Sequence, residues 1–165
     1  MAKGGHVMRE LILLRHAHAE PPVPGQADFD RPLSAEGLAE AEAVAAWLRD
    51  KALVPDRVLC SPSRRTRETL DAVIEAVGNL DKRLDASIYE ATPGTLAGLV
   101  DAHRDAERLL LVGHNPGLER LVALLSSGQS GDYRGMPPAA VAVLALPAEA
   151  EIEPGIATLS TFWWP

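Results

Sequence analysis

Short runs of apolar residues, each the length of a strand, alternate along the chain with longer segments of helical periodicity. Strand-like runs occupy residues 11–14, 57–60, 109–112 and 140–146, and a further strand is expected at 156–162. A continuous apolar run of this length is typical of a strand that is buried on both faces of a parallel sheet. The alternation predicts an α/β fold: a three-layer sandwich in which helices flank a mostly parallel central sheet.

The helical segments carry start and stop signals. The expected helices cover residues 34–53, 61–77, 95–103 and 115–125, of which the third has the weakest pattern. Ser34, Ser61 and Asn115 are expected N-caps, and prolines follow Ser61 and Asn115 at the first helical position. Residues 126–138 contain three glycines and two prolines and are expected to form a surface loop.

Length and charge limit the possible classes of protein. The 165 residues suit one domain, so we expect a single domain over 1–165 with residues 1–8 as a flexible N-terminus. The 16 Lys and Arg against 23 Asp and Glu give a net charge of −7, which argues against a partner that is a nucleic acid or an anionic membrane.

Cysteine content and hydropathy predict where the protein works. Cys60 is the one cysteine of the chain, which excludes an internal disulfide and fits a reducing compartment. The first residues lack the apolar stretch of a signal peptide, and every apolar run is far shorter than the roughly 20 residues of a membrane span. We therefore expect a cytoplasmic protein.

Two histidines follow strands in equivalent positions. His16 comes after the strand at 11–14, and His114 comes after the strand at 109–112. Ligands of open α/β sheets bind at the carboxyl ends of the parallel strands, so the two imidazoles are expected to face one crevice. The alternative is that each histidine only makes a local hydrogen bond in its loop. The equivalence of the two positions, with arginines nearby, favours the shared crevice.

The neighbouring side chains indicate an anion rather than a metal ion. Arg15 precedes His16, and a cluster follows Ser61, consisting of Arg64, Arg65 and Arg67. The planar guanidinium binds a phosphate with two hydrogen bonds, and helix N-termini add N–H groups. His18 forms a His-x-His pair with His16, but adjacent guanidinium groups would repel a metal ion. We expect no metal and no cofactor.

Five stretches together resemble the histidine phosphatase superfamily, whose fold is phosphoglycerate-mutase-like. In chain order they are residues 11–17 (LILLRHA), 30–37 (DRPLSAEG), 60–69 (CSPSRRTRET), 89–91 (YEA) and 112–117 (VGHNPG). The short chain and the GHNPG form look most like the SixA-type phosphohistidine phosphatases. The segment between the second arginine motif and Gly113 is short, which implies an open, shallow site.

The resemblance implies roles for individual residues. His16 would be the nucleophile, while Arg15 and Arg65 would bind the phosphoryl oxygens, because the Ser-x-x-x-Arg spacing from Ser61 selects Arg65. His114 would donate a hydrogen bond to the transferring group. Glu90 is either the proton donor to the leaving group or a residue that is solvated or holds an arginine.

Two aspartates and two tryptophans each have two possible interpretations. Asp28 and Asp30 either line the mouth of the site or form turns. Trp163 and Trp164 either pack on the edge of the fold or form an exposed apolar patch.

The expected function is that of a metal-independent phosphatase. It would transfer a phosphoryl group to His16 and hydrolyse the phosphohistidine, with a phosphohistidine protein or a small phosphorylated metabolite as its partner. The alternative is a non-catalytic module that binds phosphate or a phosphoprotein on the same fold. A mutase is disfavoured, because the chain lacks the extra segments that would hold a second phosphate.

Overall fold

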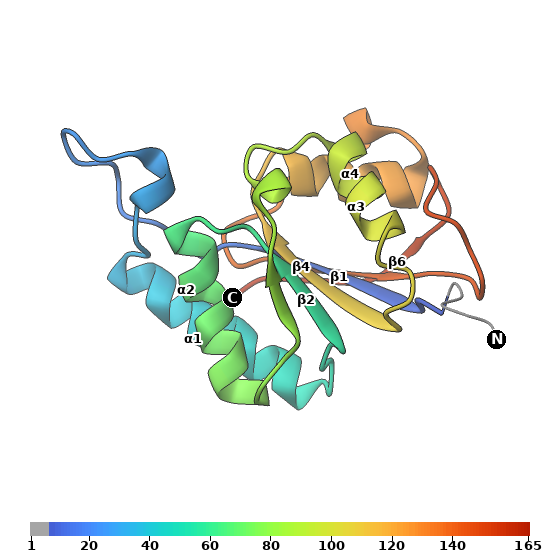
Figure 1. Cartoon of the computed structure of the whole chain (residues 1–165), viewed down its shortest axis with the longest axis horizontal. Helices are drawn as coiled ribbons and strands as arrows, with labels where there is room; N and C mark the ends of the chain where they lie inside the picture. Colours follow the sequence, from blue (N-terminus) through green and yellow to red (C-terminus); the bar gives the residue numbers. More distant parts are fainter. Residues whose placement is uncertain (1–6) are drawn as a thin grey trace.

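A six-stranded sheet forms the middle of the molecule (Figure 1). The computed structural model describes residues 7–165, and its strands lie in the order β3-β2-β4-β1-β5-β6. The strands are β1 (Glu10–Arg15), β2 (Arg57–Cys60), β3 (Lys82–Leu84), β4 (Arg108–Gly113), β5 (Val141–Ala145) and β6 (Thr158–Trp163). Neighbouring strands are parallel from β3 to β1 in this order, whereas β5 runs antiparallel to β1 and β6 runs antiparallel to β5. The predicted mostly parallel sheet is confirmed.

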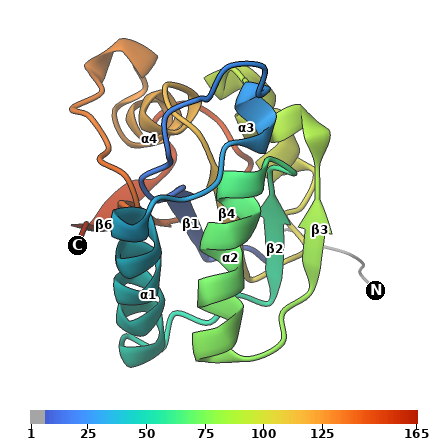
Figure 2. The ribbon, with the colours of Figure 1, turned by 90° about the vertical axis from the view of Figure 1, so that its left-hand side faces the viewer.

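Helices cover both faces of the sheet, which makes three layers (Figures 1 and 2). The helices are α1 (Ala35–Asp50), α2 (Arg64–Val77), α3 (Pro93–Asp101) and α4 (Gly117–Ser127). Helices α1 and α2 pack with Ile12 and Leu14 of β1. Helices α3 and α4 pack with Leu11 and Leu13 on the other face. Successive side chains of a strand point to opposite faces, so the continuous apolar run of β1 contributes to two cores.

Several of the expected helix boundaries differ from the structure. The α2 helix starts at Arg64 rather than Ser61, because the chain stays extended past β2 and the Ser61 N–H donates to the Val112 carbonyl. The α3 helix starts at Pro93, since the Thr92 side chain accepts the Thr95 N–H as its cap. The α1 helix ends at Asp50, because Ala52 has a φ of 56°.

The α4 helix also differs: it starts at Gly117 rather than Asn115, and it continues through Ser127 into the segment expected to be a loop. Asn115 still provides an acceptor for a backbone N–H group of the first turn, because its Oδ1 accepts the Glu119 N–H at 3.3 Å. Ser34 is the N-cap of α1 as predicted, with its side chain accepting the Gly37 N–H at 3.0 Å. Strand β3 is not among the predicted strands, because its three residues are all exposed and two are charged.

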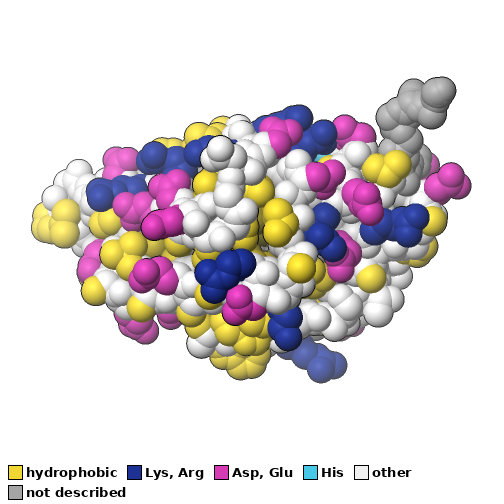
Figure 3. Space-filling model, turned by 90° about the horizontal axis from the view of Figure 1, so that it is seen from below, with side chains coloured by type: hydrophobic (Ala, Val, Ile, Leu, Met, Phe, Trp, Pro, Cys, Tyr) yellow, Lys and Arg dark blue, Asp and Glu magenta, His cyan; other side chains and the backbone are white. Residues whose placement is uncertain are grey.

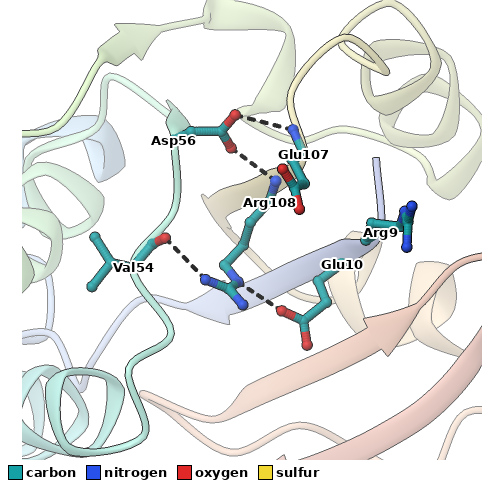
Figure 4. A pocket seen from close by; sticks show the side chains of 6 residues that line it. All are labelled: Arg9, Glu10, Val54, Asp56, Glu107 and Arg108. Atoms are coloured by element: carbon teal, nitrogen blue, oxygen red, sulfur yellow. Dashed lines mark hydrogen bonds and ion pairs between the residues drawn. The ribbon is translucent and has the colours of Figure 1, made fainter. Parts of the chain in front are cut away.

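Hydrogen bonds and one ion pair join the amino ends of the central strands (Figure 4). The Asp56 carboxylate accepts the backbone N–H groups of Glu107 and Arg108 at 3.0 and 2.8 Å. Arg108 Nε donates to Glu10 Oε1 at 2.6 Å, directly across the β1–β4 pair. These residues line a hollow of about 230 Å³. The carboxylates of Asp56 and Glu10 thus tie the amino ends of the strands together.

The ends of the described chain are tied to the body. Val7 and Met8 both donate backbone N–H groups to the Arg104 carbonyl, and the rest of the expected N-terminal segment, residues 1–6, lies outside the described residues. Trp163 stacks on Trp47 of α1 at 5.1 Å, whereas Trp164 is 53% exposed. None of the helices in residues 7–165 is long and apolar enough to cross a bilayer. On the face seen in Figure 3, acidic and basic side chains lie intermixed.

Gly37 provides a test of how closely α1 approaches the chain after β1. A Cβ at Gly37 would lie 1.9 Å from the His18 carbonyl oxygen, which is backbone and cannot move aside cheaply. Gly37→Ala is expected to lower the free energy of unfolding by about 2–3 kcal/mol or more through overpacking. Urea denaturation measures this change.

Gly98 is the matched control, because it lies in α3 and a Cβ added there would have nothing within 4 Å. Gly98→Ala is expected to raise stability by about 0.5–1 kcal/mol, the usual helical difference between the two residues. Equal effects of the two substitutions would contradict the close contact at Gly37.

Candidate active site

The two strand-end histidines lie side by side because β1 and β4 are adjacent and parallel. Arg15 pairs with Gly113 in the strand register, and the next residue on each strand is a histidine. The His16 N–H donates to the Gly113 carbonyl at 3.1 Å. The imidazole centroids of His16 and His114 are 5.3 Å apart. The pairing of two strands thus brings together residues that are far apart in sequence.

Arg65, in the first turn of α2, lies between the two histidines. Its side chain is buried. Arg65 Nε donates to His16 Nε2 at 3.3 Å, and Nη2 lies 3.4 Å from His114 Nδ1. Arg64 and Arg67 on the same helix are exposed, so Arg65 is the arginine of this cluster that faces the crevice.

His16 is held in one tautomer. Its Nδ1 lies 2.7 Å from the Ala17 carbonyl, and because a carbonyl only accepts, Nδ1 carries the proton. Burial, together with the nearby His114, Arg65 and Arg15, lowers the pKa of His16 to about 3. The neutral ring therefore presents the lone pair of Nε2 to the Arg65 guanidinium. A nucleophile at this position would be nitrogen Nε2.

His114 has a hydroxyl partner that fits either tautomer. Its Nε2 lies 2.8 Å from Ser61 Oγ, and burial followed by the Arg65 charge lowers the pKa of His114 to about 4. Arg65 Nη2 only donates, so Nδ1 is its acceptor when the ring proton is on Nε2 and is donated to Ser61 Oγ. When the Ser61 hydroxyl donates to Nε2 instead, the proton is on Nδ1, which could then donate to an anion. Ser61 is therefore a partner of His114 rather than the helix cap that the sequence suggested.

Arg15 has an unused donor. Its Nη1 donates to the Met136 carbonyl at 2.9 Å, but within residues 7–165 its buried Nε has no hydrogen-bond partner. Buried N–H groups are normally paired, and an exception calls for an explanation. An oxyanion between Arg15 and Arg65 would pair this group.

Asp28 determines which edge of the Arg65 guanidinium faces the histidines. The Asp28 carbonyl and Oδ2 accept from Arg65 Nη1 and Nη2 at 2.8 and 3.0 Å. Tyr89 Oη and Arg31 Nη1 also donate to this carboxylate at 2.6 and 2.8 Å. These hydrogen bonds, that of Tyr89 above all, hold the pKa of Asp28 well below its usual range. Asp28 thus accepts from Nη1 and from one N–H of Nη2. The Nε–H and the second N–H of Nη2 are left to face the crevice.

Glu90 lines the same hollow as Arg65 and His114 but stands apart from the arginines. The hollow has a volume of about 440 Å³. In the described part of the chain, the exposed Glu90 carboxylate has no hydrogen bond or ion pair, so it holds neither Arg15 nor Arg65. Asp28 pairs with Arg65 instead. Glu90 also has a φ of 58°, a left-handed conformation that is uncommon for residues other than glycine.

The second histidine of the His-x-His pair lies elsewhere. His18 Nδ1 bonds Ser34 Oγ at 2.7 Å, and its backbone N–H donates to Glu40. Within residues 7–165, no group of three or more His, Cys, Asp or Glu side chains is placed to hold a metal ion. The positive charge of the crevice comes from Arg15 and Arg65.

The contact between Asp28 and Arg65 can be tested by Asp28→Asn. The substitution removes the charge that orients the guanidinium, and kcat for para-nitrophenyl phosphate is expected to fall about 10- to 100-fold, as for other small misplacements of a phosphate-binding group. Asp30→Asn, on the same turn, is the control. A lower KM with unchanged kcat would show instead that Asp28 competes with the phosphoryl group for Arg65.

Comparisons with known proteins identify the family of the chain. The model of the histidine phosphatase superfamily (branch 1) matches residues 11–121. The chain is 31% identical over 127 residues to the phosphohistidine phosphatase SixA of Escherichia coli, covering 73% of this chain and 76% of that protein. It is 36% identical over 162 residues to an uncharacterized protein of Mycobacterium tuberculosis, covering 92% and 99% of the two chains.

Solved structures show the same fold. The crystal structure of the putative phosphohistidine phosphatase SixA from Agrobacterium tumefaciens superposes with a TM-score of 0.85 at 31% identity, over 96% of this chain and 99% of that one. A SixA structure with tungstate gives a TM-score of 0.79 at 25% identity, over 94% and 97%. The family match spans both strand-end histidines and both arginines, and the chain belongs to the histidine phosphatase superfamily, within which it is similar to SixA.

Proposed function

We propose that this protein is a metal-independent phosphatase that uses His16 as its nucleophile and a phosphohistidine protein or a small phosphate ester as its substrate. The observation that carries the proposal is the neutral His16 ring, whose Nε2 lone pair faces the Arg65 guanidinium. The unpaired Arg15 Nε supplies a further donor, and so does His114 Nδ1 in the tautomer in which its Nε2 accepts from Ser61. Such a set suits the dispersed negative charge of a phosphoryl group in transfer.

Substrate binding replaces one internal contact. The bond of 3.3 Å from Arg65 Nε to His16 Nε2 is long, and a phosphoryl oxygen takes its place as acceptor. Arg65 then donates from Nε and Nη2, Arg15 donates from Nε, and His114 donates from Nδ1. The lone pair of His16 Nε2 is released toward phosphorus.

The transfer has two steps. In the first, His16 Nε2 forms a bond to phosphorus while the bond from phosphorus to the leaving group breaks, and the leaving group keeps the electron pair and takes a proton. In the second, water attacks the phosphohistidine, the P–N bond breaks, and its electron pair returns to Nε2. The attacking water loses a proton, and inorganic phosphate leaves. The Nδ1–H bond to the Ala17 carbonyl keeps the ring oriented throughout.

Three features favour phosphohistidine among the possible substrates. The related Escherichia coli protein is named a phosphohistidine phosphatase. An imidazole leaves more readily than an alkoxide, so it needs less help from an acid. Glu90, the candidate acid, is exposed, and no hydrogen bond within residues 7–165 holds its carboxylate in place.

We also propose that the protein works in the cytoplasm. The buried Cys60, which forms no disulfide, fits a reducing compartment.

The covalent scheme is tested by His16→Ala, assayed in excess EDTA. Turnover of a phosphohistidine protein, sugar phosphates and para-nitrophenyl phosphate is expected to fall to background, because the atom that accepts the phosphoryl group is gone. His18→Ala, at an exposed histidine two residues away, is the control and should keep activity. Substantial turnover by His16→Ala would overturn the scheme, and activity that needs Mg²⁺ would overturn metal independence. Oxyanion binding without turnover by the unaltered protein would favour the non-catalytic module.

The role of Glu90 is tested by Glu90→Gln with leaving groups of different basicity. If Glu90 gives the proton, the loss should be about 10²–10⁴-fold for alkyl phosphates and much smaller for para-nitrophenyl phosphate and phosphohistidine. Equal losses on all substrates would show that Glu90 orients another group. No loss on any substrate would make it a surface residue.

A further inference from the structure

The hollow beside the catalytic cluster extends well past the place of one phosphoryl group. Its lining includes Arg65, His114 and Tyr89 and also Thr92 and Arg120. Its volume of about 440 Å³ lies within the range of roughly 300–1,000 Å³ that is usual for small-molecule sites. The hollow therefore has room for a leaving group beside the phosphoryl group.

Arg120 is the cation of this lining that lies outside the catalytic cluster. It lies in the first turn of α4 and is exposed. Its guanidinium lies 5.5 Å from the centre of the Tyr133 ring, the one side-chain contact that it has within residues 7–165. Arg65, the other arginine that lines this hollow, is by contrast paired with Asp28.

The position of Arg120 is electrostatically unfavourable for the folded chain alone. The N-terminal end of a helix carries a partial positive charge, which disfavours a cation in the first turn. Glu119 in the same turn offsets part of this charge, but it forms no ion pair with Arg120 within residues 7–165, and its Oε2 accepts from Asn115 Nδ2 at 3.4 Å. Stacking on Tyr133 holds the guanidinium by its face and leaves its N–H edge open to a ligand.

We propose that Arg120 binds an acidic group carried by the leaving group of the substrate, and so selects phosphorylated compounds with a second negative charge. This inference rests on the proposed phosphatase function and specifies its substrate class. The acidic group is a carboxylate or a phosphate, from a small metabolite or from a side chain beside a phosphorylated residue. Glu90 also lines the hollow and disfavours an anion beside its own carboxylate.

Matched substrates test the proposal in Arg120→Gln. The small pair is phenyl phosphate against 3- and 4-carboxyphenyl phosphate, and the peptide pair is a phosphohistidine peptide with Gln or with Glu beside the phosphohistidine. We expect kcat/KM to fall about tenfold for acid-bearing members and less than twofold for the others, as expected for a hydrogen bond to a charged group. A response in one pair alone identifies the source of the acidic group.

Arg134→Gln is the control variant, because Arg134 is exposed on the neighbouring loop and lies outside this hollow. Losses of equal size on neutral and acid-bearing members, or no loss on any, would overturn the proposal.

A binding measurement separates this proposal from the phosphatase function. Calorimetry with phenylphosphonate and carboxyphenylphosphonates, which are not hydrolysed, should show about tenfold weaker binding of the carboxylates alone in Arg120→Gln. If the unaltered protein hydrolyses none of the substrates but shows this difference, the phosphatase function fails and the acid-binding site stands. If it hydrolyses them but the difference is absent, the acid-binding site fails.

Discussion

The parallel pairing of β1 with β4 is the constraint on which the site depends. Both strands lie in the middle of the sheet and are covered on both faces, so their register cannot slip without exposing apolar side chains. That register places Arg15 opposite Gly113, and the chain leaves both strands with a histidine. Gly113 permits close packing here, because a Cβ would lie 3.1 Å from the Ile88 side chain. The precision of the site thus comes from core packing.

The second constraint is the burial of Arg65. A buried guanidinium is costly unless its N–H groups are paired, and Asp28 supplies a carboxylate and a carbonyl for two of its nitrogens. The remaining donors face neutral imidazoles, which are weak partners at 3.3 and 3.4 Å. Because burial and the nearby cations lower the pKa of both histidines, the rings do not add positive charge at neutral pH. The folded protein therefore keeps a positive crevice whose donors exchange weak acceptors for phosphoryl oxygens.

The sequence predicts the parts of this arrangement that rest on regular patterns. Continuous apolar runs locate the central strands, and the residues that directly follow them, His16 and His114, are therefore expected at one edge of the sheet. Strand β3 lacks such a run, and its exposed Lys82 and Arg83 are typical of a loop. Asp28 is not predictable as the partner of Arg65, because the contact joins a turn to a helix 37 positions later, and no periodicity connects them. Ser61 has the pattern of a helix cap, since its bond to His114 depends on the extended chain after β2.

Three groups near the carboxyl ends of the central strands are left in unfavourable states by folding. Arg15 Nε lacks an acceptor within residues 7–165, Glu90 has a left-handed backbone, and Arg120 is a cation at a helix N-terminus. At the opposite end of the same sheet, Arg108 is paired with Glu10, and Arg57 is paired with Asp105 although its buried Nε has no hydrogen bond within residues 7–165. Arg15, by contrast, has no ion pair in that range. Local conflicts of this kind persist where a ligand rather than the fold completes the interactions. The missing carboxylate partner of Arg15 is a physical reason, independent of sequence similarity, to place substrate binding at the carboxyl end.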